Sequence, residues 1–309
     1  MATICVTGGA GFIGSHVAEA LVGLGHEVLI LDDLSSGRKD NVPHGAELVV
    51  ADIRSPEAAR MIVDRRVEIL VHHAAQMDVR RSVEDPRFDS DVNIGGFLNL
   101  LEAARRGAVR HVVFASTGGA IYGEQDEFPA TEDHPLRPVS PYGVSKLAGE
   151  RYLFYYHTQY GLSATCLRYA NVYGPRQNPH GEAGVVAIFL DRILSGETPV
   201  INGDGLQTRD YVFVGDVVQA NLTVLDLAGF RTFNVGTAIE TDVNTLYEKI
   251  RTAAGEGPEP QHGPAKPGEQ LRSVISPARI RRELDVAVGT SLAEGLGITA
   301  DWFRTHRRS

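Results

Sequence analysis

The chain has 309 residues, of which 43% are hydrophobic and 22% charged, and its formal net charge at pH 7 is −9. This composition is ordinary for a globular enzyme, and the length suits one large domain or two interlocked lobes. The acidic balance argues against nucleic acid or an anionic membrane surface as a partner. Because no window approaches ~18 uninterrupted apolar residues and no signal peptide opens the chain, we expect a cytoplasmic protein without a membrane span.

The two cysteines, Cys5 and Cys166, each lie in an apolar run that predicts a buried strand. Burial as small apolar side chains explains them better than a disulfide framework. His72 and His73 are adjacent at a strand end and would point to opposite faces, so a shared metal is not expected. No other ligand cluster stands out in the sequence, and we predict no metal site.

Five apolar runs in the first half predict buried strands, at 3–8, 26–33, 46–53, 68–75 and 111–117. Helical patterns lie between most of them, such as 14–25, which Gly25 ends, and 93–107. Strands with little polar alternation, separated by helices, indicate a parallel sheet covered on both faces. The predicted fold is therefore α/β, with a doubly wound parallel sheet of the Rossmann type.

From about Tyr169 the sequence becomes rich in Gly, Pro and Asn, as in NVYGPRQNPHGEAG and GPEPQHGPAKPGE. Long loops with short elements between them are typical of a smaller substrate-binding lobe. We expect residues 1–171 to form the doubly wound domain and residues 172–309 to form mainly the second lobe. The run 232–236 would return to the first sheet, so the boundary is not a single cut.

A glycine-rich turn, TGGAGFIG, follows the first strand and opens the first helix. Gly8, Gly11 and Gly14 allow a tight turn and a close approach to a pyrophosphate, which the helix N-terminus attracts. Asp32 ends the second strand, where a carboxylate can accept hydrogen bonds from both adenosine ribose hydroxyls and repel a 2′-phosphate. This pattern favours NAD over NADP, although Arg38 nearby would attract a phosphate.

Residues at the ends of the next two strands would also meet the cofactor. Asp52 and Ile53 are placed to contact adenine. Small residues at Ala74 and Ala75, followed by Gln76, would let the cofactor lie against the tips of the sheet.

A phenol and an ammonium share one helix face in SPYGVSKLAGE, because Tyr142 and Lys146 are four residues apart. Pro141 suits a helix start. A free phenol titrates near ~10, and both a nearby ammonium and an oxidised nicotinamide would favour the phenolate. The pair predicts a proton acceptor beside a hydride acceptor, as the oxidation of a secondary alcohol requires. Ser116 and Thr117 end the fifth strand, and either hydroxyl could bridge the substrate oxygen and the phenol.

The chain resembles the extended short-chain dehydrogenase/reductases and, within them, the nucleotide-sugar epimerases of the UDP-glucose 4-epimerase type. The matching stretches run in family order over nearly the whole chain: TGGAGFIGSH, DDLSSG, HHAAQ, FASTGGAIYG, SPYGVSKLAGE, LRYANVYGPRQ, GDGLQTRDYVFVGDVV and NVG. The resemblance implies a tightly held NAD and a 4-keto sugar intermediate that turns in its pocket. It also implies a homodimer joined through a four-helix contact of helices 93–107 and 143–159, although their apolar stripes would equally cover the sheet.

The resemblance assigns candidate site residues. For the cofactor they are Gly8, Gly11, Phe12, Ile13, Gly14, Asp32, Asp33, Ser35, Ser36, Gly37, Asp52, Ile53, His73, Ala74, Ala75, Gln76, Asn93, Tyr142, Lys146 and Tyr169. For the UDP-sugar they are Thr117, Tyr142, Asn171, Gly184, Val185, Val186, Asn202, Gln207, Arg209, Lys266, Glu269 and Arg272. Tyr142 would take the proton of the sugar 4-hydroxyl, and Arg209 would clamp the diphosphate.

The chain departs from the family pattern at two places. Where this branch commonly has Arg-Pro-Gly-Glu, KPGE stands at 266–269, so a point charge replaces a planar fork. The stretch STGGAIYG has one more residue before Tyr122 than the commonest family form. The choice of catalytic hydroxyl between Ser116 and Thr117 therefore stays open, and we favour Thr117.

The sequence favours one reaction over related ones. Sugar 4,6-dehydratases carry an acidic pair after the threonine, whereas Gly118 and Gly119 stand here. Elimination then has no obvious general acid, and we expect the hydride to return to C4. UDP-glucose and UDP-galactose are the first substrates expected; net reduction, dehydration and a non-catalytic nucleotide sensor are the further alternatives.

A UDP-uronic acid is the alternative substrate. Arg192 lies in a helical stretch after the nucleotide-lining loop and could meet a negative group at sugar C6, with Arg176 as a second candidate. A surface arginine paired with Asp191 or Glu197 is the simpler explanation of Arg192.

Overall fold

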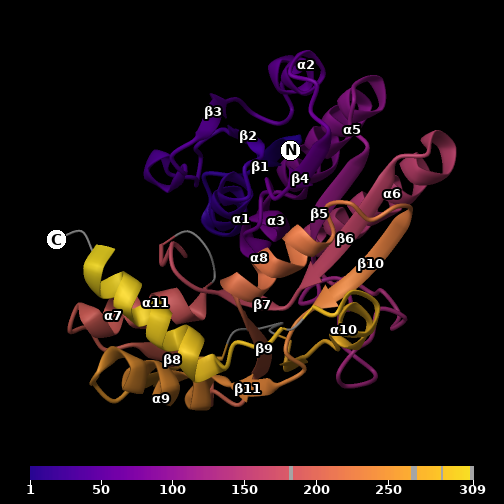
Figure 1. The fold of residues 1–309 in the computed structure, drawn as a ribbon. Coiled ribbons are helices and arrows are strands. Elements are labelled where there is room, and N and C mark those ends of the chain that lie inside the picture. The colour runs from indigo at the N-terminus through magenta and orange to yellow at the C-terminus, as the bar shows by residue number, and fades with distance from the viewer. Residues whose placement is uncertain (181–183, 266–269, 287, 307–309) are drawn as a thin grey trace.

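The computed structural model describes residues 1–180, 184–265, 270–286 and 288–306. Its centre is a parallel sheet, as predicted, and the sheet has seven strands in the order β10-β6-β5-β4-β1-β2-β3 (Figure 1). The strands are β1 (Thr3–Thr7), β2 (Glu27–Asp32), β3 (Ala46–Val50), β4 (Ile69–His72), β5 (His111–Thr117), β6 (Ser163–Tyr169) and β10 (Phe230–Val235). The order reverses at β1, which pairs with both β2 and β4, so a ligand crevice is expected at the carboxyl ends of these strands.

Helices cover both faces of the sheet because successive strand residues point to opposite sides. Ile4 and Val6 of β1 pack under α1 (Phe12–Gly23) and α8 (Val214–Thr223). Cys5 faces the other side, under α2 (Pro56–Asp64), α5 (Phe97–Arg106) and α6 (Pro141–Tyr160). Both cysteines are buried free thiols. Two apolar layers therefore hold the carboxyl edge of the sheet rigid.

The second lobe gathers around its own apolar cluster. Its helices are α7 (Val185–Leu194), α9 (Val243–Ala254) and α11 (Leu292–His306), which lie together in Figure 1. Its strands are β7 (Asn171–Tyr173), β8 (Val200–Asn202), β9 (Thr208–Phe213), β11 (Glu240–Asp242), β12 (Gln261–Gly263) and β13 (Arg272–Ser273). Between these elements the chain returns to the large sheet, where β10 pairs with β6 along its whole length.

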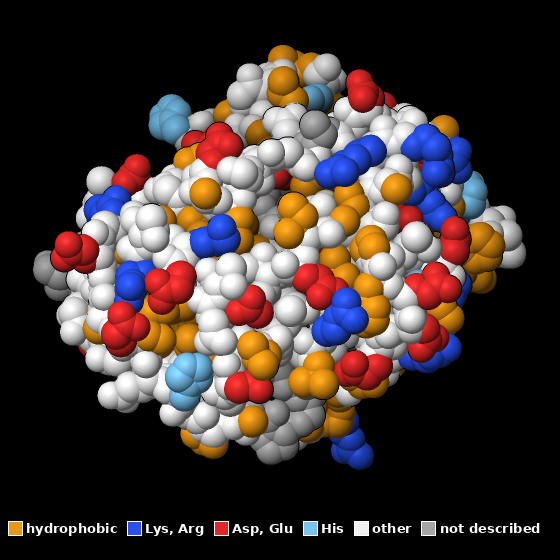
Figure 2. Space-filling view, turned by 90° about the horizontal axis from the view of Figure 1, so that it is seen from below, with side chains coloured by type: hydrophobic (Ala, Val, Ile, Leu, Met, Phe, Trp, Pro, Cys, Tyr) orange, Lys and Arg blue, Asp and Glu red, His pale blue; other side chains and the backbone are white. Residues whose placement is uncertain are grey.

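Short elements complete the chain. They are η1 (Lys39–Asn41), α3 (Val79–Glu84), α4 (Pro86–Ser90), the π-helical turn η2 (Asp91–Gly96) and α10 (Ala278–Leu284). None of the helices in the described ranges is long and apolar enough to cross a membrane. On the face seen in Figure 2, acidic and basic side chains are interspersed, without a continuous basic surface.

Several predicted boundaries differ from the structure. The third and fourth strands end at Val50 and His72, before the predicted 53 and 75, because the following residues leave the sheet to form its carboxyl-edge loops. The helix predicted at 93–107 begins as η2 and continues as α5. Gly25 follows α1 with a φ of 80°, a conformation that glycine adopts most easily, and so ends the helix as predicted.

Candidate active site

The glycine-rich turn lies between β1 and α1. Gly8 has a φ of 66°, and a Cβ there would lie 2.7 Å from the backbone nitrogen of Ala74. A Cβ on Gly14 would lie 2.2 Å from the carbonyl oxygen of Gly8. Gly11 caps α1 without a side chain, so backbone N–H groups alone form the mouth of this helix. The turn is a cradle of backbone N–H groups with room for a pyrophosphate.

Asp32 stands at the end of β2 and is 6% exposed. One carboxylate oxygen accepts the N–H of Ala10 at 2.9 Å and the other accepts the N–H of Leu34 at 2.9 Å. Burial raises the pKa of Asp32, and the two backbone hydrogen bonds lower it. Each oxygen keeps a further lone pair, as two ribose hydroxyls would need. Gly37 lies against this carboxylate, where a Cβ would come within 2.6 Å of it.

The neighbouring loop is held by its own contacts. Asp33 accepts hydrogen bonds from the N–H and hydroxyl of Ser35, at 2.9 and 2.6 Å. Arg38, the cation that would favour a 2′-phosphate, is exposed and pairs with Asp40 at 3.6 Å. The backbone cradle, the helix end and the carboxylate of Asp32 together fit NAD.

The third-strand residues form the outer end of this groove. Asp52 accepts hydrogen bonds from both the backbone and the guanidinium of Arg54, which lowers the pKa of Asp52. Ile53 is buried beside Gly96, and a Cβ built on Gly96 would lie 2.7 Å from Cδ1 of Ile53. This end of the groove therefore offers an apolar wall beside a fixed carboxylate.

Asn93 holds the loop after β4 through hydrogen bonds. Asn93 accepts the N–H of Gln76 at 2.9 Å and donates to the carbonyl oxygen of Gln76 at 2.8 Å and to Asp89 at 3.0 Å. Its amide hydrogens are thus used within the protein. Asn93 therefore shapes the edge on which Ala75 and Gln76 lie, and its expected place at the cofactor stays a prediction.

His73 and Tyr169 stand side by side at neighbouring parts of the same edge, with stacked rings 6.2 Å apart. Burial and the charge of Lys146 hold the pKa of His73 well below its usual range, so the imidazole is neutral at pH 7. The Tyr169 hydroxyl accepts a hydrogen bond from Asn221 at 2.8 Å, and burial raises its pKa. Both rings are therefore neutral at pH 7, and they can contact a cofactor as flat surfaces.

Tyr142 lies in the first turn of α6, which Ser140 caps by accepting the N–H of Gly143 at 3.2 Å. The Lys146 Nζ lies 5.9 Å from the centre of the Tyr142 ring and donates to the carbonyl oxygen of Ala115 at 2.9 Å. Lys146 is only 4% exposed. Burial lowers its pKa to about 8, against which the charge of Asp89 acts. The ammonium is therefore fixed beside the phenol.

The two hydroxyls at the end of β5 have different surroundings. Ser116 is 4% exposed and donates to Glu150 at 2.6 Å. Thr117 is half-buried, and a Cβ built on Gly119 would lie 3.8 Å from its Oγ1 and 3.7 Å from Oδ1 of Asn171. The Thr117 and Asn171 side chains therefore border one space, whereas Ser116 is used inside the protein. The geometry favours Thr117 as the catalytic hydroxyl and assigns Ser116 a structural contact.

The partner of Ser116 belongs to a buried polar network that the sequence analysis missed. Glu150 accepts two hydrogen bonds from Arg168, at 3.0 and 2.7 Å, and both side chains are 5% exposed. Arg168 also donates to the Tyr122 hydroxyl at 3.0 Å, which donates to Asn234 at 2.7 Å. The network ties α6 to β5, β6 and β10. An arginine inside an apolar strand was the available signal, because buried charges are paired.

The second lobe supplies the remaining candidates. Asn171 is exposed at the start of β7, and Asn202 and Gln207 are joined by a hydrogen bond of 3.3 Å. Arg209 of β9 donates to the carbonyl oxygen of Thr208 at 2.8 Å. Gly184 packs against Gln177, and half-buried Val185 begins α7. Lys266 and Glu269 lie outside the described residues.

Three of the predicted substrate contacts have partners within the protein, and their contact with the substrate stays a prediction. Val186 is 1% exposed and packs in the core of the second lobe. Arg272 pairs with Glu240 at 2.7 Å, and its guanidinium stands 3.7 Å from the centre of the Phe128 ring. Arg176 turns to α1 and donates to Glu19 at 2.7 Å. These side chains already have partners within the protein, a property of packing that sequence position does not reveal.

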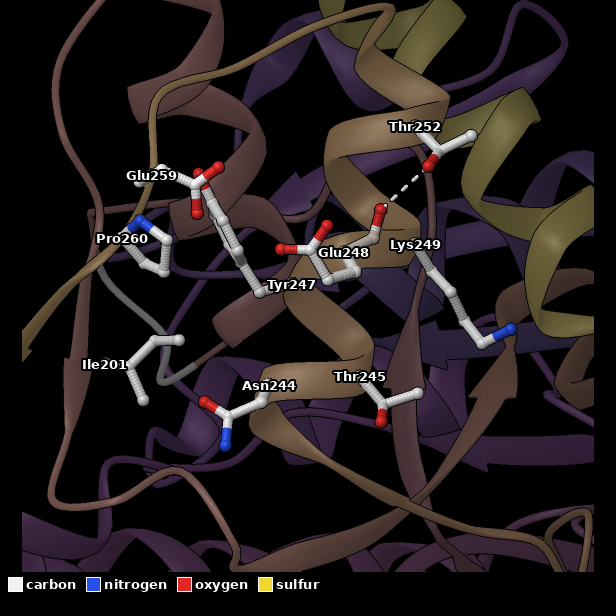
Figure 3. Close-up of a pocket in the computed structure, with 9 residues that line it drawn as sticks. All are labelled: Ile201, Asn244, Thr245, Tyr247, Glu248, Lys249, Thr252, Glu259 and Pro260. Atoms are coloured by element: carbon white, nitrogen blue, oxygen red, sulfur yellow. Dashed lines mark hydrogen bonds between the residues drawn. The ribbon is translucent and has the colours of Figure 1, made fainter.

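A surface cavity lies away from these residues. It has a volume of about 490 Å³ and opens beside α9, between Tyr247, Glu248 and Pro260 (Figure 3). None of the candidate catalytic residues lines it, so we attach no function to it.

Comparison with known proteins shows the family of the chain. Residues 4–236 match the NAD dependent epimerase/dehydratase family. The chain is 46% identical over 306 residues to a UDP-glucose 4-epimerase of Mycolicibacterium smegmatis, covering 97% of each chain. A solved UDP-glucose 4-epimerase of Thermotoga maritima, with UDP-glucose, is 44% identical with a TM-score of 0.96, covering 98% of this chain and 99% of that one. The Thermus thermophilus enzyme, in complex with NAD, is 45% identical with a TM-score of 0.94 at the same coverage.

The fold and site define an extended short-chain dehydrogenase/reductase with a dinucleotide groove. The chain belongs to the NAD dependent epimerase/dehydratase family, as the sequence resemblance predicted.

Proposed function

We propose that this chain is an NAD-dependent 4-epimerase of UDP-sugars, with UDP-glucose and UDP-galactose as its first substrate pair. The observation that carries the proposal is the arrangement at the end of β5. Tyr142 and Lys146 lie at the start of α6, and Thr117 and Asn171 both lie beside Gly119, which has room for a Cβ but carries none. Relatives named UDP-glucose 4-epimerase cover nearly the whole chain and support the same reaction.

Bound NAD would accept a hydride from sugar C4 and return it. The residues of this chain handle the proton and the orientation. Tyr142 takes the proton of the 4-hydroxyl as the ketone forms, and the Lys146 ammonium stabilises the phenolate. Thr117 donates a hydrogen bond to the 4-oxygen, so that the proton path remains aligned when the 4-keto sugar presents its other face.

Two glycines separate this reaction from dehydration. A Cβ on Gly118 would lie 2.6 Å from Cδ1 of Ile275, so an acidic side chain has no room there without a shift. Gly119 stands open beside Thr117 and carries no acid. Expulsion of a 6-hydroxyl therefore lacks a general acid at this point, which supports return of the hydride to C4.

We assign cofactor binding to residues 1–171 and sugar-nucleotide binding mainly to 172–309, with β10 returning to the first sheet. In this assignment the turn around Gly8 and Gly11 holds the pyrophosphate of NAD, and Asp32 holds its adenosine ribose. Arg209 would clamp the diphosphate of the substrate, and Asn171 would contact the sugar. The exposed position of Asn171 at the start of β7 supports the assignment.

A UDP-uronic acid is the competing substrate. Its C6 carboxylate would pair with Arg192, which is half-buried on α7. Within the described residues, neither Asp191 nor Glu197 forms an ion pair with Arg192. The competing substrate therefore enters the test below.

We also propose a cytoplasmic homodimer. Helix α6 exposes several large apolar side chains, with Phe154 53% and Tyr155 47% exposed, and with Val144, Tyr152 and Tyr160 exposed as well. Exposed apolar side chains gathered on one helix are typical of subunit contacts. Two buried free thiols suit a reducing compartment. Light scattering should report twice the mass of one chain, and a monomer at working concentration would contradict the dimer.

A product assay tests the proposed reaction. Purified protein would receive UDP-glucose and UDP-glucuronate in parallel, without added NAD, and the sugars would be separated by chromatography. We expect UDP-galactose from the first arm. Turnover of UDP-glucuronate alone would show that a UDP-uronic acid is the substrate and would favour Arg192 as the partner of its C6 carboxylate. No product in either arm, even with added NAD, would contradict the epimerase assignment.

A further inference from the structure

Asp89 of α4 is a fully buried carboxylate that accepts hydrogen bonds from three other segments of the chain. Its exposure is 0%, although its sequence neighbours Arg87, Phe88 and Asp91 lie on exposed or partly exposed positions. One oxygen accepts hydrogen bonds from Gln76 Nε2 at 3.1 Å and Asn93 Nδ2 at 3.0 Å. The other accepts the hydroxyl of Ser145 at 2.6 Å.

These contacts connect the two halves of the candidate site. Gln76 stands at the cofactor edge of β4, whereas Ser145 lies on α6 directly before Lys146. A buried charge is costly unless hydrogen bonds satisfy it, and three donors from three different segments do so here. The carboxylate therefore fixes the distance between the cofactor edge and the helix that carries the phenol and the ammonium.

We propose that Asp89 is a positioning residue, which joins the β4 edge to α6 and supplies the negative charge that keeps Lys146 protonated. This inference rests on the proposed function, because it concerns the ammonium beside the catalytic phenol. The contacts of Asp89 are all with protein groups, so it acts through Ser145, Gln76 and Lys146 rather than on the substrate.

Asp89 binds Ser145, the residue before Lys146, and its charge favours the ammonium form of Lys146. At the end of β4, His72 and the following His73 are neutral at pH 7, because burial lowers the pKa of both. From β5, the ring of Phe114 lies 5.0 Å from the ammonium, and the Ala115 carbonyl oxygen accepts its hydrogen bond. On α6 itself, Glu150 is occupied by Arg168 and Ser116.

Burial and Asp89 act on Lys146 in opposite directions. Burial lowers the pKa of Lys146 to about 8, and the charge of Asp89 raises it. Without that charge the pKa would fall further, and a growing fraction of the side chain would be neutral near pH 7. A neutral amine would not favour the phenolate of Tyr142.

The Asp89→Asn variant removes the negative charge and keeps the shape of the side chain. The asparagine has the same size, and its carbonyl can still accept from Gln76 and Asn93 while its amide donates to the Ser145 hydroxyl. Asp91→Asn is the matched control, because Asp91 lies two residues away, is exposed and carries the same formal charge. Both variants would be studied as the purified protein with its retained cofactor.

The direct readout is the titration of Lys146 by NMR. The chain has only four lysines, at 39, 146, 249 and 266, so ¹³Cε labelling gives few signals, and Lys146→Met identifies the one required. We expect the Lys146 pKa to fall by about one unit in Asp89→Asn and to stay unchanged in Asp91→Asn. A fall smaller than about 0.3 units in Asp89→Asn would overturn the proposal. If that variant does not fold, Asp89→Ser replaces it with the same criteria.

The second readout is the pH profile of kcat with UDP-glucose. The alkaline limb should move to lower pH by the same amount as the NMR titration. An unmoved limb, with a shifted Lys146 titration, would overturn the link to catalysis. Because the NMR titration needs no turnover, failure of the epimerase assignment would remain distinguishable from failure of this inference.

Discussion

The two hydroxyls at the end of β5 allow a decisive comparison. Thr117→Val keeps the shape of the side chain and removes only the hydroxyl that lies beside Gly119, near Asn171. Ser116→Ala removes the hydroxyl that donates to Glu150 at 2.6 Å inside the protein. We expect the first variant to lose activity and the second to lose stability.

The structure gives the expected size of each effect. A hydrogen bond to a buried charge contributes about 1.5–3 kcal/mol, and Glu150 keeps two hydrogen bonds to Arg168 in the Ser116→Ala variant. We therefore expect the free energy of unfolding to fall by about 2 kcal/mol, with kcat within about twofold of the wild type. For Thr117→Val we expect a kcat loss of about 10²-fold and a stability change below about 1 kcal/mol.

Urea denaturation and steady-state epimerase kinetics measure the two quantities. Thr158→Val is a matched control, because Thr158 is exposed on α6 and its hydroxyl donates only to the carbonyl oxygen of Phe154 among the described contacts. That control should change neither quantity appreciably. If Ser116→Ala lost kcat while Thr117→Val kept it, the separation of structural and catalytic hydroxyls would be wrong.

Three further variants test the phenol, the glycine-rich turn and a buried histidine at the start of β5. Tyr142→Phe should reduce kcat at least about 10³-fold yet retain NAD, and a turnover near wild type would exclude the phenol as the proton acceptor. Gly14→Ala should lose bound NAD, because its Cβ would lie 2.2 Å from the Gly8 carbonyl oxygen; absorbance of the purified protein measures this, and full NAD content would contradict the cradle. Burial lowers the pKa of His111 to about 4 from 6.5, so its contribution to stability is present above pH 6.5 and is lost as the pH falls toward 4. Between pH 7 and pH 5 this loss is about 2 kcal/mol, and His111→Asn should flatten that part of the unfolding profile; an equal slope would contradict the assignment.

The sequence was sufficient for the fold because local patterns and tertiary packing agree along the first half. The run 111–117 has an apolar centre at 112–115 and became β5 with the predicted bounds. Pro141 indicated where α6 begins and so located Tyr142. The glycine spacing fixed the turn because only glycine has room at Gly8 and Gly14.

The direction of individual side chains was harder to predict. Ser116 and Thr117 are adjacent hydroxyls, and only the packing of α6 shows which one is enclosed. Asp89 stands in RFDSD, a polar stretch typical of a solvated face, yet tertiary contacts bury it completely. Arg272 appeared available for a phosphate, but Glu240 comes from a distant strand and pairs with it.

The central claim is that one hydride leaves C4 and returns to the same carbon within one active site. UDP-glucose deuterated at C4 would be converted in ordinary water, without added cofactor, and the product would be examined by NMR and mass spectrometry. We expect UDP-galactose that retains the deuterium at C4. Loss of deuterium to solvent, or its transfer to added NAD, would contradict the account.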